Sequence, residues 1–282
     1  IVSQCGKCHE AQTETFFETF HGKVSRLGGD RAAKCSDCHG THGILEPWNP
    51  KSTLSRDNVV ATCAKCHAGS HRRFAGYLTH ATHPARDKYP WLYWSFWAMT
   101  ALLVGTLAFG VFHTIAWLVR LWLTREQWKP HRAAAIAAAK AAGVRLYRRF
   151  DRAQRMQHLV MLLSFFTLAL TGMTLKFSYA GWATVTATIL GGFESMHLLH
   201  RIGAVTLVGV FAYHLFNVNR RRKKSGLSWR KMVFGPDSLM FPRTDLLEFL
   251  ASMKWFFGAG PRPRYGRWTY WEKFDYMAVF WG

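Results

Sequence analysis

The chain has 282 residues and a formal net charge of +21. That length leaves room for about two domains of ~100–200 residues. A strongly basic chain is typical of nucleic-acid-binding proteins, but most of the later Lys and Arg residues flank apolar runs, where positive charge orients a membrane protein. We therefore expect no nucleic-acid partner. The first 88 residues are polar and rich in Cys and His, and the rest concentrates Trp, Phe and Leu, so we expect a soluble part followed by a membrane part.

All six cysteines fall in three copies of one motif, CxxCH. This is the attachment pattern of c-type haem, in which two thiols bond the porphyrin and the adjoining histidine binds the iron. Zinc, disulfide and dithiol chemistry fit less well. A four-thiolate zinc site uses two CxxC pairs, so three pairs leave one unmatched. None of the three alternatives needs a histidine directly after every second cysteine. The sequence predicts three covalent haems c, held by Cys5, Cys8 and His9, by Cys35, Cys38 and His39, and by Cys63, Cys66 and His67.

Five further histidines precede residue 89, namely His21, His42, His71, His80 and His83. An iron with two strong ligands is closed to small molecules and suits electron transfer. We favour His21, His42 and His80 as the second ligands. His42 lies so close to its own motif that we expect it to serve a neighbouring haem. His83 is a nearly equal alternative to His80, and a plain surface histidine is the alternative for each.

A segment of 88 residues buries little apolar surface by itself. We therefore expect the porphyrins to form the core of a haem-packed, three-haem cytochrome c domain over residues 1–88. Short helices are predicted over 10–20 and 59–68, with turns marked by Gly and Pro between them.

Residues 89–282 read as a transmembrane helix bundle, which makes the whole chain mainly α-helical. Residues 91–119 form an uncharged run of 29 residues that opens with Trp91, Tyr93, Trp94 and Trp97, as expected at a membrane interface. Two more spans are predicted at about 157–177 and 198–219. A fourth apolar run starts near residue 276 and is far shorter than the ~20 residues that a spanning helix needs, so we expect the chain to be part of a longer one.

The basic loops predict the orientation of these spans. Between residues 120 and 158 there are ten Lys or Arg against Glu126 and Asp151, and residues 220–224 are all basic. Such segments stay in the cytoplasm. The loop over 177–196, in contrast, has no Lys or Arg. We expect a multi-pass protein of the bacterial inner membrane with its N-terminal haem domain in the periplasm.

Histidines inside apolar spans need partners, because an ionisable group in hydrocarbon is costly. His200 and His214 lie 14 residues apart, which on one helix is about 21 Å and within ~40° of the same face. This spacing predicts two b-type haems in tandem. His158, level with His214, and His113, in the inner half of the first span, are further candidate ligands of these haems. Hydrogen bonding to helix carbonyls is the alternative for His113, His158 and His197.

Two further helices are predicted on the inner side. Residues 133–142 are rich in Ala, and residues 244–257 have an amphipathic pattern. Both are expected to lie on the membrane surface as structural cover.

Three segments resemble the di-haem cytochrome b subunits of formate dehydrogenases and hydrogenases: Gln157-His158-Leu159, residues 196–201 around His200, and residues 268–282. The likeness covers about the last 130 residues. The fusion to CxxCH motifs resembles the combined c/b-type inner-membrane cytochromes of metal-respiring bacteria over nearly the whole chain. The resemblance implies quinone chemistry and makes His158 and His200 haem ligands whose partners lie on a later helix. His214 and the first span depart from the family pattern.

The sequence therefore predicts membrane electron transfer between menaquinone or ubiquinone and periplasmic c-type cytochromes or other redox subunits, through three haems c and two haems b. One alternative is a haem-bearing membrane anchor for a larger dehydrogenase or hydrogenase. Another is a haem-based sensor, which would need five-coordinate iron. The first 88 residues have more histidines than three haems need as second ligands, which argues against five-coordinate iron and therefore against a sensor.

Overall fold

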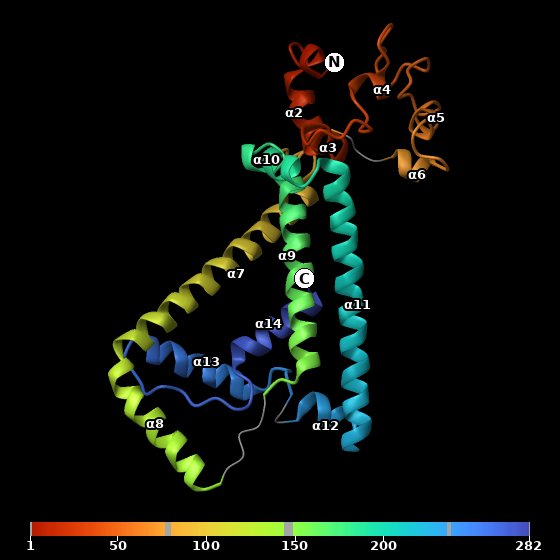
Figure 1. Ribbon diagram of the computed structural model, residues 1–282. Helices are drawn as coiled ribbons and strands as arrows, with labels where there is room; N and C mark the ends of the chain where they lie inside the picture. Colours follow the sequence, from red (N-terminus) through yellow and green to blue (C-terminus); the bar gives the residue numbers. More distant parts are fainter. Residues whose placement is uncertain (1, 77–79, 144–148, 236–237, 282) are drawn as a thin grey trace. The chain divides into compact units, whose positions relative to one another are not determined.

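The computed structural model describes residues 2–76, 80–143, 149–235 and 238–281, and within these ranges every regular element is a helix (Figure 1). The N-terminal helices are α1 (Val2–Cys5), α2 (Glu10–Glu18), α3 (Phe20–Arg26), α4 (Cys35–His39), α5 (Val59–Ala64) and α6 (Arg72–Ala75). The remainder are α7 (Pro90–Leu123), α8 (Arg125–Ala141), α9 (Arg152–Lys176), α10 (Gly181–Ile189), α11 (Phe193–Ser225), α12 (Trp229–Phe234), α13 (Arg243–Phe256) and α14 (Tyr270–Trp281). The mainly α-helical class is thus confirmed.

The chain forms two compact units. The first contains the chain up to Met99 together with Arg155–Val210, and the second contains Thr100–Gln154 with the chain from Phe211 onward. The units therefore divide the chain differently from the domain boundary expected near residue 88. Residues from both sides of that boundary share one small core in the first unit.

That core joins α3 to α10 and the start of α11. Val24 and Leu27 of α3 pack with Ala183 and Ala187 of α10 and with Phe193 of α11, and all five are buried. The sequence predicts a loop over residues 177–196. Because α10 buries small apolar side chains against α3, this segment instead links the N-terminal part to the membrane helices.

The rest of the N-terminal segment has little apolar core and is tied by side-chain hydrogen bonds to the backbone. Thr53 Oγ1 donates to the Cys38 carbonyl over 2.6 Å, and Thr62 Oγ1 donates to the Thr53 carbonyl over 2.7 Å. The Asn58 amide donates to the carbonyls of Pro50 and Ser52. These bonds fix the loop between α4 and α5, the helices that lie at the second and third CxxCH motifs.

Three helices are long and apolar enough to cross a membrane, α7, α9 and α11. They have 34, 25 and 33 residues, so each exceeds its predicted span, because the helix continues into polar flanking residues. In their most apolar windows only 0%, 17% and 6% of the residues are buried. Exposed apolar surface of this extent is unfavourable in water by about 25 cal/mol per Å², and lipid removes that cost. These findings indicate a membrane protein.

Polar residues in the middle of α9 are satisfied within the helix. Ser164 donates to the Met161 carbonyl, Thr171 to the Thr167 carbonyl and Thr174 to the Leu170 carbonyl, over 2.7–2.9 Å. Hydroxyls that bond to their own helix in this way are tolerated in hydrocarbon. They also leave their oxygens able to accept a second hydrogen bond.

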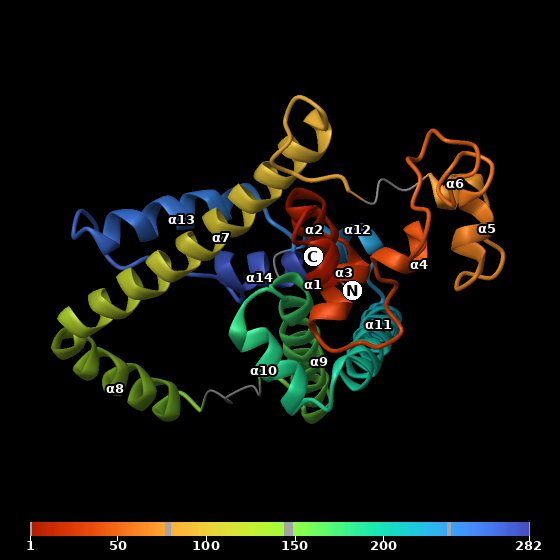
Figure 2. The ribbon, with the colours of Figure 1, turned by 90° about the horizontal axis from the view of Figure 1, so that it is seen from above.

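In the second unit α13 packs along the last turns of α7 (Figure 2). Phe109 contacts Phe249 with ring centroids 6.0 Å apart, and Trp117 contacts Trp255 at 5.1 Å. Thus α13, which begins at Arg243, covers a membrane helix rather than only a lipid surface. The fourth span expected near residue 276 lies in α14, which has 12 residues.

A buried ion pair holds α14 to α13. The Lys273 ammonium lies 2.7 Å from Asp245 Oδ1, and the two residues are only 6% and 2% exposed. Removal of one partner from such a pair leaves an uncompensated buried charge, which is unfavourable.

We predict that Lys273→Met lowers the free energy of unfolding by about 3–5 kcal/mol, because the Asp245 carboxylate is left buried and unpaired. Thermal unfolding of the detergent-solubilised protein, followed by far-ultraviolet circular dichroism, checks this. Arg221→Met is the matched control. Its partner Asp151 is half exposed, so the loss should be only about 0–1 kcal/mol. Equal losses in the two variants would contradict the prediction.

Candidate functional site

Each CxxCH motif forms one helical turn. The amide of His9 donates to the Cys5 carbonyl over 3.0 Å, the amide of His67 donates to the Cys63 carbonyl over 2.9 Å, and the second motif is α4 itself. In a helical turn, residues i, i+3 and i+4 share one face. The two thiols and the imidazole of each motif are therefore directed to one side of the backbone. None of the six cysteines forms a disulfide bond.

Two of the motif histidines face a second histidine. The His39 ring lies 6.5 Å from the His80 ring, centroid to centroid, at an interplanar angle of 40°. The His67 ring lies 6.1 Å from the His21 ring at 44°. In both pairs one histidine belongs to a CxxCH motif and the other comes from a distant part of the chain.

These separations fit one iron between two imidazoles. A transition-metal bond to an imidazole nitrogen is about 2.0–2.1 Å, as for zinc. With ring bonds of about 1.33 Å, the centroid lies about 1.1 Å beyond the nitrogen. Two imidazoles on opposite sides of one iron would thus have centroids about 6.2–6.4 Å apart. The observed separations of 6.1 and 6.5 Å lie close to that range.

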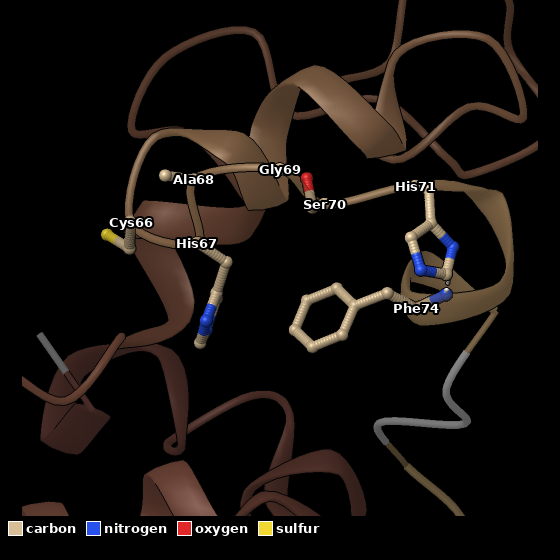
Figure 3. Close-up of a pocket in the computed structure, with 7 residues that line it drawn as sticks. All are labelled: Cys66, His67, Ala68, Gly69, Ser70, His71 and Phe74. Carbon is tan, nitrogen blue, oxygen red and sulfur yellow. Dashed lines mark hydrogen bonds between the residues drawn. The ribbon is translucent and has the colours of Figure 1, made fainter.

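His67 also lines an open pocket of about 360 Å³ at the third motif (Figure 3). Cys66, Phe74 and His71 line it as well, and the Phe74 ring lies 4.9 Å from the His67 ring. His71 is engaged elsewhere, because its Nδ1 accepts from the Phe74 amide and caps α6. The pocket therefore offers an aromatic wall and the motif imidazole together.

A threonine sets the orientation of His80. Thr15 Oγ1 lies 2.9 Å from His80 Nδ1, and the same hydroxyl donates to main-chain carbonyls of α2. Because its single proton is used there, the hydroxyl oxygen accepts from Nδ1–H. His80 then keeps its lone pair on Nε2, the form in which a histidine binds a metal.

His83, the sequence-level alternative to His80, has other partners. Its ring stacks on Phe96 with centroids 3.8 Å apart, and its Nδ1 lies 3.7 Å from the Glu18 carboxylate. The structure therefore places His80, and not His83, opposite a motif histidine. His42 is exposed, and so is His9, the histidine of the first motif.

Burial affects the charge of the paired histidines. It lowers the pKa of His21, His39 and His80, and the neighbouring His67 lowers the pKa of His21 further. These rings are thus held in the neutral form that has a lone pair for a metal. Burial and the nearby Cys5 thiol raise the pKa of Cys35, so thiols of different motifs lie close together.

In the membrane part, His200 has the same arrangement as His80. Its Nδ1 lies 2.8 Å from Thr171 Oγ1, whose proton goes to the Thr167 carbonyl. His200 therefore donates from Nδ1 and keeps its lone pair on Nε2. A Cβ added at Gly172 would lie 3.8 Å from the His200 ring, an ordinary contact distance, so the ring lies beside α9 at this glycine.

His113 and His214 have different surroundings from His200. The Nε2 nitrogen of His113 contacts the Tyr270 hydroxyl, and that of His214 lies 2.8 Å from the Tyr276 hydroxyl. The ring nitrogen that would bind iron is thus engaged by a tyrosine in both cases. His158 is exposed on α9, and His197 stacks on Phe193.

The sequence did not identify four hydrogen-bond partners of these histidines: Thr15, Thr171, Tyr270 and Tyr276. Thr171 had a signal, because a hydroxyl within an apolar run one helix before His200 is a natural hydrogen-bond partner. The tyrosines carried no such signal, since their partners lie 157 and 62 residues away.

No protein family, curated protein or solved structure matches this chain in the comparisons made with it. Among the described residues, no group of three or more His, Cys, Asp or Glu side chains is arranged to hold a metal ion.

We predict that Gly203→Leu disturbs His200 by pushing α11 away from α9. A Cβ at this position already lies 3.2 Å from Leu168, and overpacking of this kind costs about 1–3 kcal/mol. A lower midpoint of thermal unfolding than that of the wild type checks this. Gly209→Leu is the control, because a Cβ there meets nothing within 4 Å, and it should leave the midpoint nearly unchanged. A similar shift in both variants would refute the close contact.

Proposed function

We propose that the chain transfers electrons between the quinone pool and a redox partner on the outer side of a bacterial inner membrane, through three haems c and two haems b. The observation that carries the proposal is the spacing of the His39–His80 and His21–His67 pairs. When bound, haem supplies one-electron chemistry at its iron. The protein then needs no nucleophile of its own.

The residues that would hold the haems c follow from the motifs and the pairs. The three pairs of thiols would attach the porphyrins, and His9, His39 and His67 would bind the irons. His80 and His21 would be the second iron ligands at the second and third motifs. His42 remains the proposed partner for the first motif, on the sequence argument alone.

The small apolar core of the N-terminal segment supports the same proposal. Only Val24, Leu27 and Ala32 are buried apolar residues among the described part of the first 88 residues, and they pack against α10 and α11. A segment of this size needs another source of stability. Three porphyrins with their axial ligands would provide one.

In the membrane part, His200 is the ligand that the geometry supports best, because Thr171 fixes its ring and leaves Nε2 with its lone pair. His158 and His214 complete the proposed b-haem set on the sequence argument, and His214 would bind iron in place of its hydrogen bond to Tyr276. Two histidines of α11 that are 14 residues apart would place two irons along one helix, about 21 Å apart along its axis. Electrons then have a route across the hydrocarbon layer.

The defining experiment is a pyridine haemochrome spectrum of the purified chain produced in a host that matures c-type cytochromes. We expect three haems c and two haems b per chain, reducible by a membrane quinol. Soret absorbance that is absent, or zinc in place of iron, would end the proposal. Three haems c with no haem b would remove its membrane half, and a tightly bound molybdenum, tungsten or nickel subunit would favour the anchor role.

We predict that His80→Ala opens one haem c to carbon monoxide. Loss of an axial imidazole leaves five-coordinate iron, which binds small molecules, whereas the six-coordinate wild type does not. The reduced-minus-carbon-monoxide difference spectrum checks this. His83→Ala is the matched control, because that ring stacks on Phe96 and faces no motif histidine, and it should bind no carbon monoxide. The opposite result in the two variants would exchange their roles.

A further inference from the structure

Arg120 is the first charged residue after the uncharged run of α7, which extends over residues 91–119. Because α7 is long and apolar enough to cross a membrane, a charged residue at the end of this run lies where hydrocarbon gives way to phospholipid headgroups. Trp117, one turn earlier, belongs to a residue type that is enriched at this depth. Arg120 is therefore within reach of lipid phosphates.

The Arg120 guanidinium group lies over the C-terminal end of α13. A Cβ added at Gly258, which follows the C-cap residue Phe257, would lie 3.6 Å from Nη2 and 3.7 Å from Nη1 of Arg120. Gly258 has a φ of +76°, the left-handed conformation that glycine commonly adopts after a helix. This turn brings the start of the loop between α13 and α14 against the arginine.

The hydrogen-bond donors of Arg120 are not satisfied by the chain. Three of the last carbonyls of α13 already accept from the amides of Phe257, Gly258 and Ala259. The Nε atom of Arg120 is buried and has no acceptor among the described residues. A positive charge at a helix C-terminus is favourable, but an arginine also has five N–H donors to satisfy. The side chain is thus suited to bind an anion from outside the chain.

The surroundings of Arg120 are basic. Residues 249–271 include four Lys or Arg and no Asp or Glu. One of the four is Arg262, whose guanidinium carbon lies 5.6 Å from the Trp117 ring centroid and 5.8 Å from that of Trp255. Trp117 and Arg120 are three residues apart on α7, so they share one face of that helix. Two guanidinium groups therefore lie along the same face and attract an anion.

An apolar surface adjoins the guanidinium group of Arg120. Phe257, next to Gly258, is 75% exposed, and its ring stacks on that of Phe112 with centroids 6.5 Å apart. Phe112 is also exposed and lies about two turns before Arg120, within the uncharged run. Donors for a phosphate and rings for attached acyl chains thus occur together, which favours a phospholipid over a free phosphate ion.

We propose that Arg120 and Arg262 form a binding site for an anionic phospholipid, with the phosphate at the guanidinium groups and the acyl chains along Phe112 and Phe257. The lipid supplies acceptors that the chain does not give to Arg120. A zwitterionic phospholipid carries an ammonium group beside its phosphate, and the basic surroundings repel that group. All of these residues belong to the second compact unit, and the site needs no haem, so it is independent of the proposed function.

The site is tested with the full chain in a non-ionic detergent after removal of bound lipid. Dioleoyl-phosphatidylglycerol is the anionic probe, dioleoyl-phosphatidylcholine is the zwitterionic comparison, and native mass spectrometry measures the affinity for each. We expect the wild type to bind one phosphatidylglycerol at concentrations at which it binds no phosphatidylcholine. Equal affinity for the two lipids would overturn the proposal.

Two substitutions remove the proposed ligands one at a time. A basic residue beside an anionic lipid contributes about fivefold to binding, so Arg120→Gln and Arg262→Gln should each weaken phosphatidylglycerol binding by about fivefold or more. Arg120→Lys keeps the charge and should lose less affinity than Arg120→Gln. An unchanged affinity in Arg120→Gln would refute the site, and if that variant does not fold, Arg262→Gln decides in the same way.

Arg125→Gln is the matched control. It removes the same charge five residues further along the chain, from a guanidinium group that pairs with Glu126 over 3.2 Å. Because an exposed pair of this kind contributes little, phosphatidylglycerol binding should change by less than about twofold. A loss equal to that in Arg120→Gln would indicate diffuse attraction to a basic surface and would overturn the site.

Thermal unfolding separates a lipid from a free anion. A ligand that binds only the folded chain raises the midpoint of unfolding. Phosphatidylglycerol should raise it in the wild type and in Arg125→Gln, but not in Arg120→Gln or Arg262→Gln, and the lipid-free midpoint of each variant shows whether it is folded. If millimolar inorganic phosphate raises the midpoint equally and displaces the lipid, the site binds a free anion and the lipid proposal fails.

Discussion

Two imidazole rings that face each other across about 6 Å are the arrangement on which the N-terminal part depends. The helical turn of each CxxCH motif fixes one ring of the pair, since its backbone bonds join the first cysteine to the histidine. The other ring comes from α3 or from the segment after α6, so the pairs His21–His67 and His39–His80 link distant stretches of chain. This segment has few buried apolar side chains, so haem bound between these rings would supply the stability that a hydrophobic core supplies in other proteins.

The membrane histidines show how hydrogen-bond counting separates two roles. A threonine that has already donated its proton to its own helix accepts from Nδ1 of His200 and leaves Nε2 with a lone pair. At His113, in contrast, the Nε2 nitrogen contacts the Tyr270 hydroxyl. The first arrangement leaves Nε2 available to a metal, whereas the second engages it. Both satisfy a polar ring that hydrocarbon alone could not tolerate.

In the proposed function, electrons enter sites that are buried in the protein. An electron that enters a buried site is easier to accommodate when a compensating charge can move nearby, because the interior screens charge poorly. The α13–α14 region has the groups for such compensation, with the buried Lys273–Asp245 pair and the Glu248 carboxyl group beside it. The same ion pair holds these two helices together.

The amino-acid sequence alone predicts the mainly helical class, the three long apolar helices and the three CxxCH turns, because these depend on composition and on spacings of a few residues. Helix ends were less predictable, since polar flanks extend α7, α9 and α11 beyond their apolar runs. Residues 177–196 were taken for a loop because α10 gains its stability from packing on α3, a contact with no local signal. Only the tertiary structure decided which of His80 and His83 faces His39, and that Tyr270 and Tyr276 engage His113 and His214. Such choices depend on contacts between side chains that lie dozens of residues apart in the chain. Tertiary packing, and not the local sequence, decides which of these side chains meet.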